Sequence, residues 1–428
     1  MKIKNIAIIA HVDHGKTTFV DQLLKKSGTF RENEEVAVRA MDSNDIERER
    51  GITILAKTTS IHYDGYKINI LDTPGHADFG GEVERIMNMV DGVLLLVDAY
   101  EGTMPQTRFV LKKALEAGVK PIVVINKVDK PTARVEKVLD EVIDLFIELG
   151  ASEEQLDFKV AYVSALNGTA SLDPDISTQS ESYDDIFNLI INEIPEPNAN
   201  PDGNLQFQPA LLDYNEYVGR IGIGKVHSGT IKVNEMVSCV RLDGSIKQFR
   251  IQKLFGFDGL KRVEINEAKA GDIAAVAGLM DISVGETICN VGKEDALPIL
   301  RIDEPTLKMT FMVNNSPFVG KEGSIVTARK IGERLFKETQ KDVSLKVEES
   351  GNESWVVSGR GELHLSILIE NLRREGFELQ VSKPEVIIKE IDGVKCEPYE
   401  DVQIEVSDDC VGNVIEALGL RGGKMYNM

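Results

Sequence analysis

Residues 6–18, IAIIAHVDHGKTT, constrain the fold of this chain more than any other segment. They begin with an apolar run that suits a buried parallel strand, and residues 16–24 continue with the composition of a helix. The first-turn N–H groups of such a helix point back at the preceding loop and favour an anion there. The segment therefore predicts a phosphate-binding loop between a strand and a helix.

The closing Gly-Lys-Thr supplies groups that suit a nucleotide phosphate. Gly15 lets the backbone approach the phosphates, the Lys16 ammonium reaches the β- and γ-oxygens, and the Thr17 hydroxyl can bind Mg²⁺. The segment departs from the G-x-x-x-x-G-K-[ST] pattern at Ala10, which stands where the first glycine is usual. A Gly-Lys-Thr can also simply begin a helix, so the prediction depends on the motifs that follow.

Composition limits the kinds of protein that this chain can be. Its 428 residues, 42% hydrophobic and 28% charged, predict a globular protein of about three domains. Apolar runs such as residues 92–97 are too short to cross a membrane, and the start, MKIKNIAII, has no cleavable signal pattern. We therefore expect a cytoplasmic protein without membrane contact. The four cysteines show no C-x-x-C spacing, which favours reduced thiols over a zinc site.

The charge balance bears on possible partners. A net charge of −21 argues against a general affinity for nucleic acid, because such binding depends on basic contacts to phosphate. Any nucleic-acid partner must therefore be bound through local basic patches.

A second motif follows a long polar segment. Residues 27–49 lack a clear period and are expected to form a mobile loop, with Thr53 just beyond it. Residues 66–71 alternate as a strand does and end at DTPGH. Asp72 there matches the acid on the Mg²⁺ side of phosphate-loop enzymes, and Gly75 allows the backbone to approach a γ-phosphate.

A third motif indicates which base is bound. Residues 121–125 form a predicted strand that leads into Asn126-Lys127-Val128-Asp129, at the strand end where ligands collect in parallel sheets. A carboxylate at Asp129 can accept both N1–H and the exocyclic N–H₂ of guanine, whereas adenine offers no such pair of donors. The motif therefore predicts GTP rather than ATP. Backbone contact to the base is expected from three residues after the next strand: Ser164, Ala165 and Leu166.

The order of expected elements predicts a multidomain α/β and β protein. Residues 1–198 alternate strands and helices, as in a doubly wound P-loop GTPase domain. Short β-branched runs in residues 205–295 predict a β-barrel, and residues 301–391 give the order βαββαβ of a ferredoxin-like domain. In that domain SGRGEL is interpreted as a glycine-rich entry to a helix rather than a ligand site. Residues 396–428 are expected to begin a further α+β domain, with a strand over 402–406 and a helix from 412, that the chain does not complete.

The motifs AHVDHGKTT, RGITI, DTPGHADF, NKVD and SAL, in this order, resemble those of the translational GTPases over essentially the whole chain. Longer stretches, such as SNDIERERGITI, NSPFVGKEG and SGRGELHLSILIENLRREGFEL, are most similar to the BipA family, also called TypA. Elongation factor G usually carries an insert in its GTPase domain that finds no room here, and elongation factor Tu continues with a second barrel. LepA and the ribosomal protection proteins share the domain plan and stay as alternatives.

The resemblance implies a GTPase that alternates between GTP and GDP states and uses Mg²⁺. Thr17 and Thr53 would ligate the metal in the GTP state, and Asp72 would hold its water shell. His76 would be the catalytic residue that orients the attacking water, with Val12 and Ile52 as a hydrophobic gate. The remaining residues implied in nucleotide binding are Asp13, His14, Gly15, Lys16, Thr18 and Gly75 for phosphate, and Asn126, Lys127, Asp129, Ser164, Ala165 and Leu166 for guanine.

The resemblance also implies a partner. Such a protein would be a monomeric, ribosome-associated factor in translation, stress response or ribosome assembly, activated by rRNA of the large subunit and contacting tRNA. The motifs contain no clear arginine finger, although Arg48 and Arg50 are candidates, so slow intrinsic hydrolysis is expected. A second hypothesis is a GTP-loaded module that regulates a protein partner, which the acidic charge favours.

Overall fold

The computed structural model describes residues 1–28, 45–50, 53–300, 302, 304–351, 353–400, 402, 404 and 406–428, without the side chains of Arg48 and Ala77. The chain divides into two compact units, Met1–Glu397 and Pro398–Met428. Among the described helices, none combines the length and apolar character that a membrane span requires.

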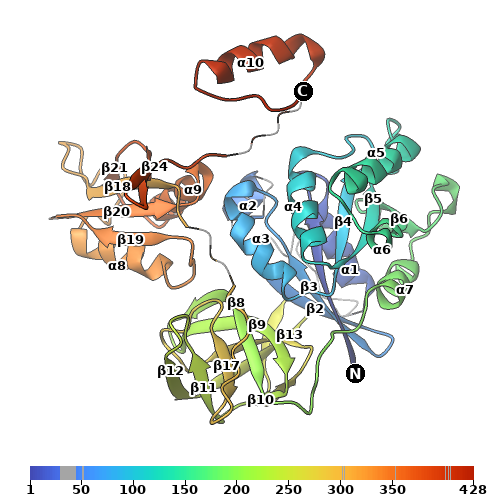
Figure 1. Ribbon diagram of the computed structural model, residues 1–428, viewed down its shortest axis with the longest axis horizontal. Helices are drawn as coiled ribbons and strands as arrows, with labels where there is room; N and C mark the ends of the chain where they lie inside the picture. Colours follow the sequence, from blue (N-terminus) through green and yellow to red (C-terminus); the bar gives the residue numbers. More distant parts are fainter. Residues whose placement is uncertain are drawn as a thin grey trace. The chain divides into compact units, whose positions relative to one another are not determined.

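The larger unit begins with a seven-stranded sheet in the order β2-β3-β1-β4-β5-β6-β7 (Figure 1). Its five central strands are parallel, and β2 and β7 pair antiparallel at the edges. The central strands are largely apolar because both faces of the sheet are covered. The strands are β1 (Lys2–Ala10), β2 (Lys57–Tyr63), β3 (Tyr66–Asp72), β4 (Gly92–Asp98), β5 (Lys120–Asn126), β6 (Lys159–Ser164) and β7 (Thr169–Ser171).

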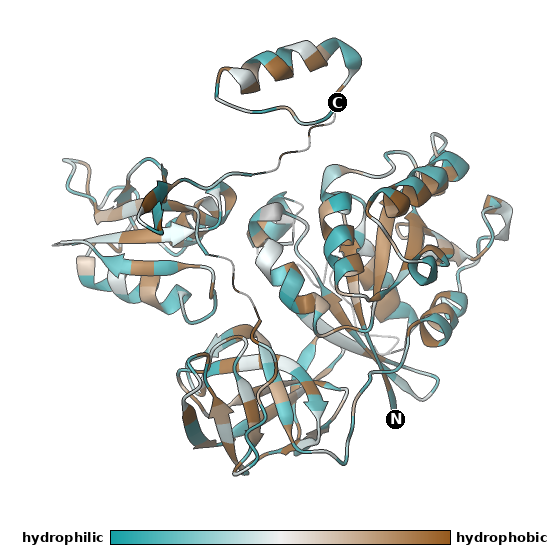
Figure 2. Cartoon of the chain, in the orientation of Figure 1, coloured by the Kyte–Doolittle hydropathy of each residue, from teal (hydrophilic) through white to brown (hydrophobic). Residues whose placement is uncertain are grey.

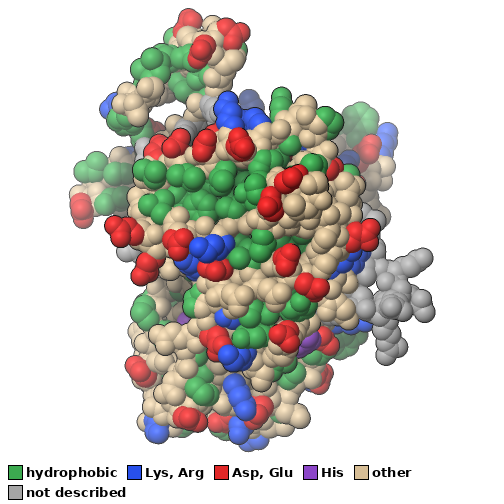
Figure 3. All heavy atoms as spheres, turned by 90° about the vertical axis from the view of Figure 1, so that its right-hand side faces the viewer, with side chains coloured by type: hydrophobic (Ala, Val, Ile, Leu, Met, Phe, Trp, Pro, Cys, Tyr) green, Lys and Arg blue, Asp and Glu red, His purple; other side chains and the backbone are tan. Residues whose placement is uncertain are grey.

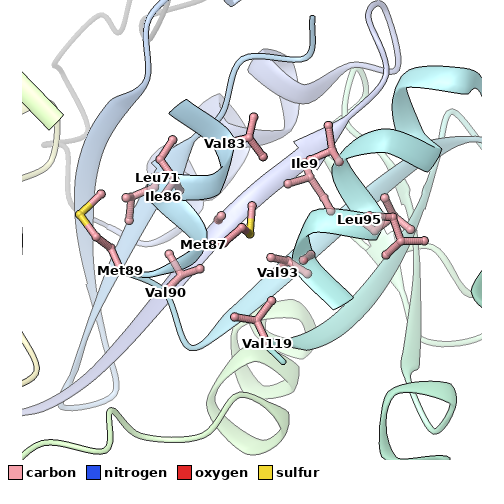
Figure 4. Packing of buried hydrophobic residues seen from close by; sticks show 14 of the residues in the cluster. Ile9, Leu71, Val83, Ile86, Met87, Met89, Val90, Val93, Leu95 and Val119 are labelled. Carbon is pink, nitrogen blue, oxygen red and sulfur yellow. The ribbon is translucent and has the colours of Figure 1, made fainter. Parts of the chain in front are cut away.

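Helices pack on both faces of this sheet and define two apolar cores. Ile9 and Leu95 point toward α3, α4 and α5, whereas Ile6 and Ile8 point toward α1 and α7 (Figure 4 shows the first core). The central strands are largely hydrophobic in Figure 2, and the helices alternate in character along their length. The domain is therefore doubly wound, as predicted. Its helices are α1 (Lys16–Lys26), α2 (Asp45–Arg50), α3 (Gly80–Met87), α4 (Pro105–Glu116), α5 (Val135–Glu148), α6 (Glu153–Leu156) and α7 (Asp184–Glu193), with short η1 (Ala77–Phe79) and η2 (Ile176–Thr178).

One expectation for this domain needs correction. The segment 27–49 is not a loop throughout, because its end belongs to α2, where Ile46 and Glu47 are buried. Residues 29–44 lie outside the described part of the chain. The edge strand β2 was also not predicted, although its polar and apolar residues alternate around Ile61.

An eight-stranded antiparallel sheet follows, in the order β12-β11-β17-β8-β9-β16-β13-β14, with a separate β10-β15 pair. It encloses a core that includes Phe207, Val226, Val237 and Ile288, which agrees with the predicted barrel. The strands are β8 (Gln206–Asn215), β9 (Gly219–Ser228), β10 (Thr230–Lys232), β11 (Met236–Val240), β12 (Ile246–Arg250), β13 (Lys253–Asp258), β14 (Lys261–Glu264), β15 (Glu267–Lys269), β16 (Ile273–Ala277) and β17 (Thr287–Asn290).

The barrel shares its contact surface with the GTPase domain. Barrel residues such as Ile221 and Phe257 join the apolar core beneath α3. The backbones of Ser60 and Gly259 exchange two hydrogen bonds, and Lys67 Nζ lies 2.8 and 2.9 Å from the two carboxylate oxygens of Asp272. The two domains are therefore joined by a packed interface and not only by the proline-rich segment between them.

Replacing Lys67 with methionine is expected to destabilise this interface. The Lys67 and Asp272 side chains are only 9% and 15% exposed, so the substitution leaves a carboxylate with little solvent and no cation. Removing one partner of a buried ion pair costs about 3–5 kcal/mol. Urea unfolding should show that loss, whereas Lys232→Met should cost less than about 1 kcal/mol, because its pairing with Glu267 is exposed. Equal effects of the two substitutions would contradict the expectation.

The third part of this unit is a ferredoxin-like domain. Its sheet order, β19-β20-β18-β21 with β22 paired to β18, and its two helices match the predicted βαββαβ order. Phe311, Trp355 and Leu365 contribute to its core. The elements are β18 (Leu307–Val313), α8 (Ala328–Glu338), β19 (Lys346–Glu349), β20 (Ser354–Gly359), α9 (Glu362–Arg374), β21 (Leu379–Val381) and β22 (Glu385–Val386), followed by the hairpin β23 (Lys389–Ile391) and β24 (Val394–Cys396).

The smaller unit, Pro398–Met428, contains η3 (Asp408–Cys410) and α10 (Val411–Gly419). The helix agrees with the prediction from residue 412. The strand expected over 402–406 is not found at residues 402, 404 and 406, and residues 403 and 405 lie outside the described part.

Candidate functional site

A pocket opens where β1, β5 and β6 end at their carboxyl edges. Most residues predicted to bind nucleotide line it, although their motifs lie far apart in the sequence. His14, Asp72, His76 and Ser164 are not in its lining. The lining residues are Ala10, His11, Val12, Asp13, Gly15, Lys16, Thr17, Thr18, Thr53, Gly75, Asn126, Lys127, Asp129, Lys130, Ala165 and Leu166.

Gly15 is required by both conformation and space. Its φ of 90° lies in the left-handed region, and a Cβ at this position would lie 2.4 Å from Asn126 Nδ2. Helix α1 begins directly after it at Lys16, so first-turn N–H groups face the pocket. This geometry suits an anion in the pocket.

Asn126 and Lys127 hold three loops together. Asn126 Nδ2 donates to the carbonyl of His14 at 2.8 Å, and its Oδ1 accepts from Ala165 N at 3.1 Å. Lys127 Nζ donates to the carbonyl of Asp13 at 2.6 Å and pairs with Asp98 at 2.6 Å. These contacts place both residues as supports of the pocket edge at which the base is predicted to bind. Asp129 lines the same edge with an exposed side chain.

Asp98 is a site residue that the motifs did not identify. Burial opposes its charged form, but hydrogen bonds from Lys127 and from the Tyr100 N–H outweigh burial and lower the pKa of Asp98 to about 2. The residue therefore stays ionised and fixes the Lys127 ammonium. Its place at the end of the apolar strand β4 is the signal that could have identified it.

The structure corrects the role expected for His14. Its side chain is buried, Nδ1 accepts from Asp98 N at 3.2 Å, and burial lowers its pKa to about 4. An uncharged ring that faces the interior cannot pair with phosphate, so His14 supports the loop from behind. Ser164 is also buried, and its hydroxyl accepts from Asn167 N at 3.4 Å.

Oxygen atoms gather on the side of the pocket where Mg²⁺ is predicted to bind. Thr53 Oγ1 donates to Asp72 Oδ2 at 3.4 Å, and Lys16 Nζ lies 2.8 Å from Asp72 Oδ1. Thr17 lines the pocket beside them. Within the described residues, no group of three or more His, Cys, Asp or Glu side chains is placed to bind a metal. Hydroxyl and carboxylate oxygens nevertheless suit Mg²⁺, which completes its shell with substrate phosphates and water.

Glu47 is a second residue that the motifs missed. It is buried, and its Oε1 accepts from the N–H groups of Ile54 at 2.9 Å and Leu55 at 3.2 Å. Lys57 Nζ pairs with its other oxygen at 2.6 Å. These bonds anchor the residues that follow Thr53 to helix α2.

His76 lies at the entry to η1, outside the pocket lining, with a side chain 34% exposed. Its Nδ1 accepts from Asp78 N at 3.2 Å. Of the predicted gate, Val12 lines the pocket, and Ile52 lies outside the described residues. Of the two arginine candidates, Arg50 ends α2 with an exposed side chain and is absent from the described lining, and the side chain of Arg48 is not described.

Comparison with known proteins decides the family. Residues 1–196 match the family described as elongation factor Tu GTP binding domain, and residues 219–289 match elongation factor Tu domain 2. The chain is 68% identical over 427 residues to the large ribosomal subunit assembly factor BipA of Bacillus subtilis strain 168, covering 100% of this chain and 69% of that protein. The chain belongs to the BipA family.

Other relatives agree with this assignment. The proteins of the same name from Escherichia coli and Synechocystis are 55% and 54% identical, and the alignments cover all of this chain and 70% and 72% of theirs. A crystal structure of a protein from Thermus thermophilus shares the fold, with a TM-score of 0.64 and 19% identity over 91% of this chain and 67% of that one. The predicted resemblance is confirmed, and this BipA-family chain is a GTPase.

A partly buried carboxyl group, that of Glu82, lies on α3 and is absent from the described lining of the pocket. Burial raises the pKa of Glu82 to about 7, against the opposing effect of Arg85, and Asp342 raises it further. The folded protein holds the Glu82 proton more tightly than the unfolded chain does, so Glu82 contributes to the free energy of unfolding at low pH. That contribution is lost as pH rises through about 7.

Glu82→Gln is therefore expected to stabilise this GTPase at pH 8 and to change little at pH 4.5. The gain should be at most about 3 kcal/mol, since each pKa unit corresponds to ~1.4 kcal/mol. Urea unfolding at the two pH values measures it. Glu136→Gln, on the exposed face of α5, is the matched control and should show no such pH dependence. A gain that is equal at both pH values would contradict the expected titration.

Proposed function

We propose that this GTPase acts on the large ribosomal subunit during its assembly, in the cytoplasm and as a monomer. The observation that carries the proposal is the identity over the whole chain with proteins named as large ribosomal subunit assembly factors. The proposed domains are residues 1–198, 205–295, 301–391 and 396–428, with the first as the nucleotide switch.

The pocket supports specific roles in phosphate binding. The backbone of residues 13–18 and Gly75 would surround the phosphates, with the Lys16 side chain turning from Asp72 to the β- and γ-oxygens. Thr17 and Thr53 would hold Mg²⁺, and Asp72 would hold its water shell. The metal would neutralise charge on the phosphates. Thr53 would respond to the γ-phosphate, and the bonds from Glu47 would pass its movement to α2.

Guanine recognition is assigned to the opposite edge of the pocket. Asp129 would accept the two donors of the base, while the backbone at Ala165 and the side chain at Leu166 would flank it. Asn126 and Lys127 would act mainly by holding these loops together, because their polar atoms already bond to the protein.

The catalytic step is assigned to His76, which would orient the attacking water. The ring has room to move, since about a third of its surface is exposed. Arg50 is the candidate arginine finger whose side chain is described, and it is absent from the described pocket lining. An external activator would therefore be needed to place the His76 ring against the water. We propose rRNA of the large subunit as that activator, with tRNA as a further contact. Lys and Arg are interspersed with Asp and Glu on the face in Figure 3, so RNA would meet local basic groups.

The test is GTP turnover by this chain alone, with isolated bacterial large subunits and with small subunits. We expect large subunits to raise kcat on the order of 10²-fold, the scale on which a positioned proton-transfer group acts. Small subunits serve as the matched RNA-rich control and should have little effect. No stimulation by large subunits would overturn the proposal and direct attention to a protein activator.

A further inference from the structure

Asp78 connects the switch region of the GTPase domain with the ferredoxin-like domain. It lies in η1, two residues after His76, and its Oδ2 accepts from His364 N at 3.2 Å, in the first turn of α9. Its other oxygen lies 3.5 Å from His76 Nδ1. One carboxylate, only 18% exposed, therefore contacts both a proposed catalytic side chain and a helix N-terminus nearly three hundred residues away.

Gly361 shows that this contact is closely fitted. A Cβ at residue 361 would lie 2.3 Å from Asp78 Oδ2, inside any possible contact distance. The backbone itself does not demand glycine, because φ is −163°, an extended conformation open to any residue. Glycine is therefore required here by the approach of the Asp78 carboxylate.

The surroundings of α9 hold the contact in place. His364 Nε2 lies 2.5 Å from Asp342 Oδ2, and Arg360 N donates to His364 Nδ1 at 3.3 Å. The His364 ring also packs edge-on against Phe79 at 5.8 Å. Beyond it, Ile367 of α9 shares an apolar cluster with residues on both sides of Thr53, namely Ile46 and Ile54. The helix thus contacts both segments that flank the γ-phosphate side of the pocket.

We propose that Asp78 is a positioning residue through which the ferredoxin-like domain sets the orientation of His76. This inference rests on the proposed catalytic role of His76. The N-terminus of α9 holds the Asp78 carboxylate and thereby fixes η1, from which the Asp78 N–H donates to Nδ1 of the imidazole. A neutral ring that accepts at Nδ1 carries its proton on Nε2.

The contact between Asp78 and α9 also bears on partner binding. A movement of the ferredoxin-like domain that withdraws α9 removes one hydrogen bond from Asp78 and frees the His76 ring. Because Asp78 and Gly361 are both absent from the described lining of the nucleotide pocket, the effect falls on the hydrolysis step and not on GTP affinity. A partner that binds the ferredoxin-like domain can therefore influence catalysis without touching the nucleotide.

The test uses the full chain with Gly361→Ala and Asp78→Asn. We expect each to lower kcat for subunit-stimulated GTP hydrolysis by about 10- to 100-fold, because small displacements of catalytic groups have effects of that order. The Kd for GTP should stay within about twofold, so that the loss appears in kcat and not in nucleotide binding. Gly412→Ala is the matched control, since a Cβ there meets nothing within 4 Å.

A double variant separates coupling from general damage. Asp78→Ala removes the carboxylate atoms with which a Cβ at residue 361 would clash. Adding Gly361→Ala to Asp78→Ala should therefore cause little further loss of kcat. Full additivity of the two losses would overturn the inference, as would an unchanged kcat in Asp78→Asn. Asp78→Asn does not change any residue of α9, so it tests the positioning role of Asp78 even if Gly361→Ala fails to fold. Two outcomes separate this inference from the proposed function of His76. A normal rate of GTP hydrolysis in His76→Ala would overturn the catalytic role of His76. A loss in His76→Ala without a loss in the Asp78 variants would overturn only the positioning role of Asp78.

Discussion

Asp129→Asn is expected to lower the affinity for GTP by about 10²- to 10⁴-fold, because the substitution places an amide donor where two guanine donors arrive. A site built to hydrogen-bond a substrate rejects an analogue that leaves its polar groups unpaired by about 10⁴- to 10⁵-fold. We expect a smaller loss of GTP affinity here, because the Asp129 side chain is exposed. Xanthosine triphosphate carries an oxygen in place of the exocyclic amine, so the variant should gain affinity for it. Calorimetric titration with both nucleotides measures the exchange.

The control for this prediction is Asp140→Asn, an aspartate exposed on α5. It makes the same chemical change outside the pocket lining and should leave both affinities as they are. Unchanged GTP affinity in Asp129→Asn would show that the base is recognised elsewhere.

His76→Ala is expected to lower subunit-stimulated GTP hydrolysis by about 10²- to 10⁴-fold, the usual contribution of a positioned proton-transfer group. The Kd for GTP should be nearly unchanged, because the His76 ring is absent from the described pocket lining. Single-turnover hydrolysis and nucleotide titration together separate the two effects.

His62→Ala is the matched histidine control. His62 lies on β2 with 45% of its side chain exposed, and its Nε2 lies 3.6 Å from Oδ1 of the exposed Asp258. It should hydrolyse GTP at the normal rate. A normal rate in His76→Ala as well would remove His76 from the mechanism.

The sequence could predict which residues gather at one pocket because the signals of the proposed nucleotide site are local. Gly15 and Lys16 follow an apolar strand directly, and Asp129 stands at the end of another, so chain connectivity alone brings each group to one edge of the sheet. Most of the residues named from these motifs line a single pocket.

The direction of individual side chains could not be predicted from these motifs. His14 stands in the middle of the phosphate loop, yet the left-handed conformation of Asp13, with φ of 63°, turns the chain so that the histidine ring faces the interior. Asn126 and Lys127 likewise bond to neighbouring loops. Such details depend on backbone dihedrals and on partners that a motif does not specify.

The sequence by itself determined the nucleotide chemistry, the family and the order of the domains, because periodicity and motif spacing are properties of short segments. Only the tertiary structure decided how the domains are joined. Lys67 pairs with Asp272, and Asp78 meets the N-terminus of α9 beside Gly361. Each contact joins residues more than two hundred positions apart, and no local pattern encodes such a partner. Gly361 shows the difference: in sequence it is a permissive helix entry, and in the folded chain it is the space that a carboxylate from another domain occupies.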